Sequence, residues 1–214
     1  MTQRPPLSMA HHTPRLISIA VGLCQPLLIR DDGPGATRSV VSGIRKSPVS
    51  SLDNPLPIFC GVLGLEGDAQ ADLTVHGGRD KALYCYPERH YAYWKRALTA
   101  SATRQERLEH YGALGENLTI AELDENSVYL GDLWEVGEVC LQVTLPREPC
   151  FKFNAVMGDP QASKKMVLEQ ACGWYLTVLN PGTLAAGQVI TVRPGPRHQT
   201  VGQAFLKTVR PDRL

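Results

Sequence analysis

The clearest pattern of apolar and polar positions lies in EVCLQVTL, residues 138–145. From Val139 to Leu145 every second residue is apolar, and the residues between them are Cys, Gln and Thr. A period of two is typical of a strand with one buried face. Pro146 follows and has no N–H to donate to a neighbouring strand. The pattern therefore predicts a half-buried strand that ends at Pro146.

Further short runs rich in β-branched residues are separated by turn residues along the whole chain. The runs are ISIAV, SVVSGI, DLTV, LWEV, WYLTVL and QVITV, among 19 glycines and 16 prolines. Many short strands with frequent turns predict a barrel or closed sheet. The first run lies in LISIAVGLC, whose apolar core of about seven residues is at the bottom of the range for an export signal, and Leu23 is too bulky for its cleavage site. We therefore interpret it as the first strand.

Helical patterns are few. Residues 87–98 place apolar side chains on one face, and residues 100–111 form a second candidate that stops at a glycine. A third helix is expected to begin with Asp159 as its N-cap and to end at Gly173. The predicted fold is therefore mainly β with about three helices, an α+β chain built around a β-barrel.

Composition narrows the class of protein. The chain has 214 residues, 43% of them apolar, and a net charge of +1, which does not favour nucleic-acid binding or an anionic membrane surface. No apolar run approaches the roughly 20 residues of a membrane span. The six cysteines form no C-x-x-C pair, so neither a zinc site nor a secreted disulfide framework is indicated. We expect a cytoplasmic protein whose cysteines are reduced and, apart from one, mostly buried.

The cysteine that we do not expect to be buried is Cys150, in TLPREPCFKFN, just after the predicted strand. The prolines stiffen the segment, and Arg147 and Lys152 would favour the thiolate by lowering the pKa of the thiol, while Glu148 would oppose them. A thiolate attacks electrophiles and binds soft metals. The alternative is a small buried hydrophobic residue beside solvated charges.

Two other segments carry candidate chemistry. In HGGRDK, Gly77 and Gly78 would let backbone N–H groups approach an anion, and Arg79 and Lys81 add positive charge. His76 could be a core residue, a general acid/base or a ligand, and the two glycines alone could form a hairpin turn. In GENLT, Glu116 and Asn117 precede an apolar strand, and read alone they form a turn with a capping amide.

Taken together, the segments GLEGDAQADLTVHGGRDKALYCYPERHYAYW, GENLT, SVYLGDLWEVGEVCLQVTLPREPCFKF and GWYLTVLNPG resemble the MOSC domain, the C-terminal domain type of molybdenum cofactor sulfurases. The chain is most similar to stand-alone bacterial MOSC proteins linked to resistance against 6-N-hydroxylaminopurine. The resemblance covers residues 17–193 and implies a β-barrel of the pyruvate-kinase-barrel type. It implies a MOSC domain over 17–195 and a short C-terminal tail over 196–214 where relatives carry a three-helix extension. Residues 1–16 are polar and proline-bearing, so we expect a disordered tail there.

The resemblance also implies a function. In relatives the hallmark cysteine, here Cys150, is proposed to carry sulfur or to bind molybdenum. The catalytic residues would then be Cys150 and His76, with Cys150 as the metal ligand. The implied cofactor-binding residues are Gly77, Gly78, Arg79, Lys81, Glu116, Asn117, Arg147 and Lys152.

We expect a molybdenum-cofactor protein that reduces N-hydroxylated bases or related N–O compounds. The chain has no flavin, Fe–S or nicotinamide motif, so electrons would come from a separate reductase.

One alternative is a sulfur carrier, with a persulfide on Cys150, that serves the cofactor biosynthesis or sulfuration machinery. Another is a binding barrel without turnover. MOSC domains are often fused to pyridoxal-phosphate enzymes, but no Schiff-base lysine is recognisable here, so that cofactor is not expected in this chain.

Overall fold

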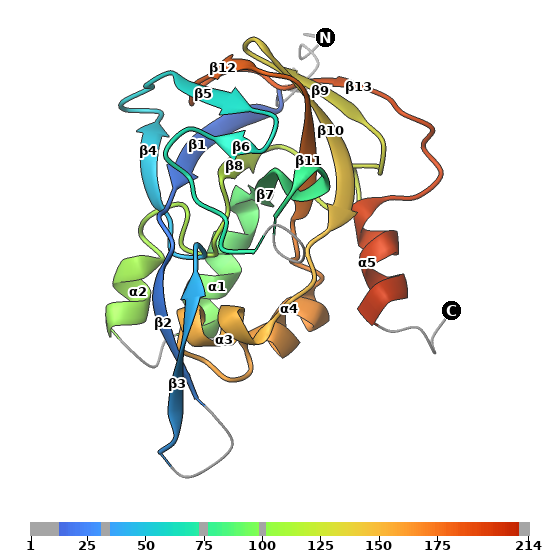
Figure 1. Cartoon of the computed structure of the whole chain (residues 1–214). Coiled ribbons are helices and arrows are strands. Elements are labelled where there is room, and N and C mark those ends of the chain that lie inside the picture. The colour runs from blue at the N-terminus through green and yellow to red at the C-terminus, as the bar shows by residue number, and fades with distance from the viewer. Residues whose placement is uncertain (1–12, 31–34, 73–76, 99–101, 210–214) are drawn as a thin grey trace, which may run out of the picture.

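The computed structural model describes residues 13–30, 35–72, 77–98 and 102–209. Its largest element is a curled eight-stranded sheet (Figure 1). The strand order is β13 (Thr191–Arg193), β9 (Leu133–Val136), β10 (Val139–Pro146), β11 (Trp174–Asn180), β7 (Leu83–Pro87), β8 (Leu118–Ala121), β1 (Arg15–Val21) and β4 (Ser47–Ser51). Neighbouring strands are antiparallel except β7 and β8, which are parallel. The mixed α+β, barrel-like fold class is confirmed.

The two ends of this curled sheet are joined through β1. The N–H groups of Leu16 and Ile190 donate to the carbonyls of Gln188 (2.9 Å) and Pro14 (2.8 Å), and Gly187 donates to Leu16 (2.7 Å). Residues 187–190 run directly into β13, which pairs with β9. These bonds satisfy backbone groups that would otherwise lie on an open edge.

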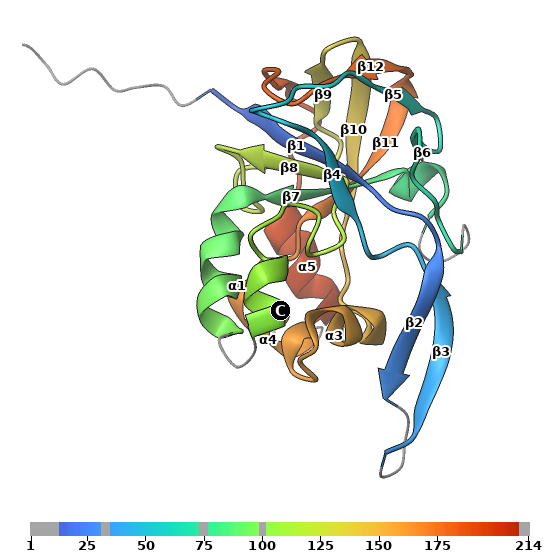
Figure 2. The same cartoon turned by 90° about the vertical axis from the view of Figure 1, so that its left-hand side faces the viewer.

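Two smaller sheets complete the β structure. β5 (Ile58–Gly61) pairs with β6 (Gly64–Leu65) and with β12 (Gly182–Leu184). β2 (Gln25–Arg30) and β3 (Thr37–Ser42) form a long hairpin that projects away from the rest of the molecule (Figure 2). Of the predicted strands, DLTV lies largely outside the described residues.

The described residues include five α-helices, where three were predicted. They are α1 (Tyr91–Ala97), α2 (Ala102–Arg107), α3 (Phe151–Met157), α4 (Ala162–Glu169) and α5 (Val201–Val209), with 3-10 turns η1 (Arg79–Lys81) and η2 (Glu88–His90). Helices α1 to α4 gather at one end of the sheet (Figures 1 and 2).

The first two helix predictions are confirmed in position, although α2 is shorter than expected. The third prediction placed both ends wrongly. Gln161 is the N-cap of α4, and the left-handed Gln170 ends it. Asp159 instead accepts the N–H of Gln161 (2.8 Å) in the turn before the helix. Helix α3 was not predicted, and α5 lies in the segment interpreted as a C-terminal tail.

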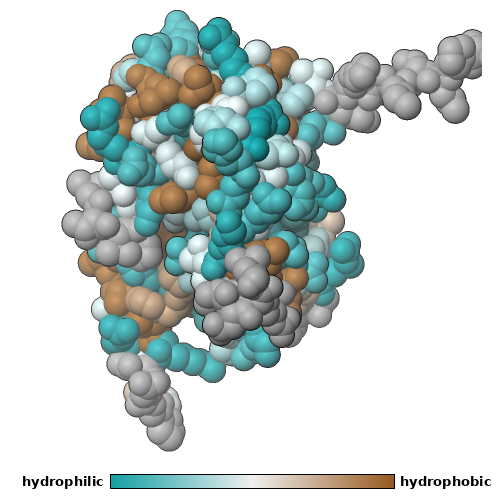
Figure 3. Space-filling view, turned by 90° about the vertical axis from the view of Figure 1, so that its right-hand side faces the viewer, coloured by the Kyte–Doolittle hydropathy of each residue, from teal (hydrophilic) through white to brown (hydrophobic). Residues whose placement is uncertain are grey.

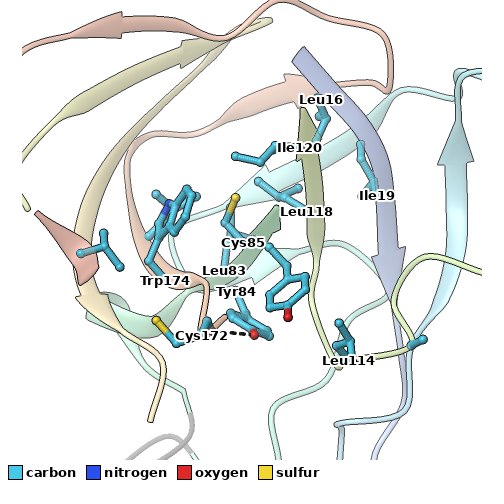
Figure 4. Packing of buried hydrophobic residues seen from close by; sticks show 14 of the residues in the cluster. Leu16, Ile19, Leu83, Tyr84, Cys85, Leu114, Leu118, Ile120, Cys172 and Trp174 are labelled. Carbon is cyan, nitrogen blue, oxygen red and sulfur yellow. Dashed lines mark hydrogen bonds between the residues drawn. The ribbon is translucent and has the colours of Figure 1, made fainter. Parts of the chain in front are cut away.

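Apolar side chains fill the inside of the curled sheet (Figure 4). Trp134 and Trp174 meet edge to face with ring centroids 5.7 Å apart, and both are almost fully buried. The face shown in Figure 3 carries many hydrophilic side chains, with apolar side chains in patches between them. Among the described residues, no helix is long and apolar enough to cross a membrane.

Candidate functional site

A cavity of about 100 Å³ lies where several loops meet beside the end of β10. It is called the Cys150 cavity below. Its walls come from the segments 42–46, 68–71, 81–84, 115–117 and 147–152, and from Tyr175. Cys150, Arg147, Asn117, Lys81 and Lys152 were predicted as site residues from sequence, and all five line this one cavity.

Cys150 lies between strand β10 and helix α3. Its backbone is extended (φ −134°, ψ 166°), and it occupies the N-cap position of α3. Its carbonyl accepts the N–H of Phe153 in α3 (2.9 Å) and the hydroxyl of Ser163 in α4 (3.3 Å), so both helices help to fix its position. The residue is partly exposed and lines the cavity, as expected for a reactive group held just past a strand end.

The other cysteines lie outside this cavity. Cys60, Cys85 and Cys172 are buried, and burial raises the pKa of each thiol, in Cys60 to about 12. Thiols of this kind stay protonated and unreactive. Cys24 and Cys140 are partly exposed, which differs from the expectation that every cysteine except Cys150 would be mostly buried.

Arg147 is a buried cation beside the thiol, with only 5% of its surface exposed. Its guanidinium lies over the rings of Tyr84 (4.9 Å to the centroid) and Phe153 (4.6 Å). Burial alone would lower the pKa of Arg147, but Tyr84, Tyr175 and Cys150 raise it above its usual value, so the side chain stays charged. In the described part of the chain, no carboxylate lies within salt-bridge distance of it.

Further cations give the cavity an excess of positive charge. Lys81 lies over the ring of Tyr175, 5.6 Å from the centroid, and Lys152 lines the wall on the α3 side. Glu148 is the exposed acidic residue of this wall. A buried guanidinium and two lysines around one thiol favour an anionic ligand, because a buried charge is stabilised by a partner of opposite sign.

Lys46 and Asp68 form a buried ion pair in the wall that sequence reasoning did not identify as part of the site. Their side chains are 7% and 3% exposed, and Asp68 also accepts the N–H of Gly22 (2.8 Å) and the amide of Asn117 (2.8 Å). Tyr84 and Tyr175 were also missed. The one available signal was the position of Asp68 in the unusual loop before HGGRDK.

The structure separates the roles of Glu116 and Asn117. Asn117 lines the cavity, whereas Glu116 is absent from its walls and is fully buried. The Glu116 carboxylate accepts the N–H groups of Gly112 (2.8 Å) and Leu114 (3.1 Å) and the hydroxyls of Tyr91 and Thr119. Glu116 therefore supports the loop, and the expectation that it contacts a cofactor directly is not supported.

The HGGRDK segment contributes less than predicted. His76 lies outside the described residues, and of the rest only Lys81 lines the cavity. The N–H of Gly78 donates to Oε1 of Gln70 (3.0 Å), so this donor serves the loop itself and not a bound anion. A Cβ on Gly77 would lie 2.2 Å from the same oxygen, so a larger residue there would have to displace the Gln70 side chain. Arg79 is exposed.

The donor set suits a metal that brings most of its own ligands. Among the described residues, no three His, Cys, Asp or Glu side chains gather into a metal-binding group. The cavity offers one thiol, a soft ligand, surrounded by cations. These residues fit a metal centre whose other ligands belong to an anionic cofactor.

Comparison with known proteins shows which family the chain resembles. The MOSC domain family model matches residues 72–191. The chain is 42% identical to YiiM of Escherichia coli over 124 residues, 58% of this chain and 54% of that protein. It is 33% identical to the uncharacterised YflK of Bacillus subtilis over 169 residues, 79% of this chain and 69% of that protein. The chain thus spans about half the length of the E. coli relative.

Other similarities extend the comparison. A Gibberella moniliformis protein named "Reductase" is 35% identical over 163 residues, 75% of this chain but only 28% of that protein. The crystal structure of YiiM from Geobacillus stearothermophilus matches with a TM-score of 0.69 and 25% identity, covering 92% of this chain and 85% of that one. With the family model matching more than half of the chain, the conclusion is direct: this chain belongs to the MOSC domain family.

Proposed function

We propose that the Cys150 cavity binds the molybdenum cofactor, with the Cys150 thiolate as the protein ligand of the metal. One observation carries this proposal. A partly exposed thiol shares a cavity with Arg147, a buried cation that has no carboxylate partner among the described residues. A ligand that combines a soft metal with an anionic group satisfies both at once.

Different residues of the cavity would bind the metal and the anionic groups of the cofactor. Cys150 would hold the metal. Arg147, Lys81 and Lys152 would neutralise the anionic groups of the cofactor, including its terminal phosphate. Lys46 is less available because Asp68 already neutralises it. The enclosed volume of about 100 Å³ is below the roughly 300–1,000 Å³ of a complete small-molecule site, so the ligand would also extend through the mouth of the cavity.

The bound cofactor would supply two-electron chemistry, which we propose serves the reduction of N-hydroxylated bases or related N–O compounds. The protein's part would be placement and electrostatics, with His76 proposed to exchange protons with the substrate. Electrons would come from a separate reductase. The fungal relative named "Reductase", in which the similar region is 28% of the length, supports an oxidoreductase role.

The decisive experiment compares Cys150→Ser with Cys140→Ser in a host that makes the cofactor. Both thiols are partly exposed, but only Cys150 lines the cavity. Wild type and Cys140→Ser should carry about one molybdenum per chain and protect cells against N-hydroxylated bases. Cys150→Ser should lose both, because a hydroxyl is a much harder ligand than a thiolate. Its melting temperature should match that of wild type when both proteins come from a host without the cofactor, where no bound ligand adds stability.

Other outcomes point to other functions. Cyanide-releasable sulfur on Cys150 without molybdenum would favour the sulfur carrier of the cofactor sulfuration machinery. Protein with neither molybdenum nor labile sulfur would favour a binding barrel without turnover. A Cys150→Ser protein that stays loaded and protective would remove Cys150 from the mechanism.

A further inference from the structure

A second cavity, of about 380 Å³, lies between the start of β4 and the end of α2. It is called the Arg45–Arg107 cavity below. Its charged and polar wall residues include Arg45, Lys46, Ser47, Arg107, His110 and Tyr111. Figure 1 shows α2 beside the start of β4, and both segments contribute to the wall.

The charge of this cavity is one-sided. Two arginines, a lysine and a histidine line it, and no aspartate or glutamate does. Lys46 is neutralised by Asp68. Arg45 and Arg107, in contrast, have no carboxylate within salt-bridge distance in the part of the chain that the structure describes.

The two arginines are close enough to repel each other. Burial is the main cause that lowers the pKa of Arg107, and the charge of Arg45 lowers it further, while the buried Glu116 and Tyr91 act in the opposite direction. Like charges held together cost stability, and the cavity wall supplies no carboxylate to pair with them directly. An anion between them would remove this cost, because it would pair with both.

The walls are held in place before any ligand arrives. A Cβ on Gly22 would lie 2.1 Å from the carbonyl oxygen of Arg45, and Gly112 (φ +87°) packs against the backbone of Lys46. Nε of Arg107 donates to the carbonyl of Ala113 (3.0 Å). This bond fixes the guanidinium and leaves its terminal nitrogens for a ligand.

From these observations we infer that the Arg45–Arg107 cavity, which adjoins the Cys150 cavity through the shared wall residue Lys46, is a second anion site that binds the phosphate group of a small molecule. The fork of an arginine side chain matches phosphate oxygens, and the hydroxyl of Ser47 is a further donor in the wall. The volume lies within the roughly 300–1,000 Å³ range of small-molecule sites. The inference does not depend on the function proposed for Cys150.

Calorimetric titration tests the inference on full-length protein from a host that makes the molybdenum cofactor. The probes are inorganic phosphate, pyrophosphate and AMP at low ionic strength, because chloride screens exposed arginines. We expect at least one probe to bind with a Kd below about 1 mM. If AMP binds, the natural ligand is a phosphorylated metabolite. If pyrophosphate or phosphate binds and AMP does not, the natural ligand is a free phosphate.

The variants locate the site. Arg45→Gln should weaken binding about tenfold, the effect of losing one charge-assisted hydrogen bond. Arg45 is exposed, so the variant should fold. Arg96→Gln removes the same charge from an exposed position on α1 and should leave binding unchanged. Molybdenum content should be unchanged in Arg45→Gln.

Three results would overturn the inference. The first is no binding of any probe to the wild-type protein. The second is binding that Lys152→Gln weakens and Arg45→Gln does not, which would place the anion in the Cys150 cavity. The third is loss of molybdenum in Arg45→Gln, which would make this cavity part of the cofactor site.

Discussion

Replacing Arg147 by methionine separates the two reasons for which a protein could bury a charge. Methionine keeps the apolar stem and much of the volume of arginine but removes the guanidinium. If Arg147 is buried to hold an anion, the variant should fold as well as the wild type and lose the ligand. If it is buried to hold the fold together, stability should fall first.

The expected change in unfolding free energy follows from opposing terms. The guanidinium lies 4.9 Å from the Tyr84 centroid and 4.6 Å from that of Phe153, and two desolvated cation–π contacts contribute about 4 kcal/mol. Burying a charge costs several kcal/mol. The terms nearly cancel, so we expect Arg147→Met to change the unfolding free energy by no more than about 1–2 kcal/mol. Binding should lose about 1.5–3 kcal/mol, a factor of about 10 to 150.

Two measurements decide the matter. Urea unfolding should use protein from a host without the cofactor, because bound ligand would itself add stability. Molybdenum content should be measured on protein from a host that makes it. Arg147→Lys is the matched control, since it keeps the charge and should retain more molybdenum than Arg147→Met. Arg147→Met protein that is destabilised by more than about 3 kcal/mol but keeps its molybdenum would refute the reasoning.

Two further predictions concern residues that support the cavity. Gly77→Ala should lower the unfolding free energy by about 1–3 kcal/mol in urea unfolding, because the new methyl group would displace Gln70 and break its bond to Gly78. Burial raises the pKa of Glu116, so the folded state binds its proton more tightly than the unfolded state. The stability of wild type relative to Glu116→Gln should therefore be highest below the unfolded pKa of about 4.5 and fall as pH rises through the folded pKa. A constant difference across pH would contradict this.

Sequence reasoning succeeded where the signal was local. The alternation from Val139 to Val143 predicted one strand, and Pro146 ended it, so the position of Cys150 just past a strand end followed directly. Leu145 was expected on the buried face but is 42% exposed, where the register with β11 shifts between Val143 and Pro146. The cation three residues before Cys150 lines the same cavity. Period and turn chemistry act over a few residues, and these were enough to predict the barrel-like class.

Sequence reasoning failed where structure depends on distant partners. Lys46 and Asp68 are 22 positions apart, and neither segment alone indicates a buried pair. Helix α3 has seven residues and ends at the left-handed Gly158, so it is too short to show a periodic pattern. Glu116 resembles a ligand in sequence, but the donors that surround its carboxylate come from Tyr91, Gly112, Leu114 and Thr119. Only the folded chain shows that these donors use its acceptor capacity.

The buried charge of Arg147 also depends on residues that no local pattern connects. The N–H of Arg147 donates to the carbonyl of Gly173 (3.2 Å), and the N–H of Gly173 donates to the carboxylate of Glu125 (2.7 Å). The hydroxyls of Tyr84 and Tyr86 bind the carbonyls of Cys172 (2.8 Å) and Ala171 (3.1 Å).

Three buried side chains therefore hold the 171–173 turn, and the turn holds the backbone of Arg147. A cation fixed in this way stays beside Cys150 whether or not an anion is bound. Binding then does not carry the cost of ordering a long side chain, about 0.5–1.5 kcal/mol for each one immobilised. The strand framework thus contributes to affinity for an anion through Glu125 and Tyr86, which lie outside the cavity, as well as through Tyr84 in its wall.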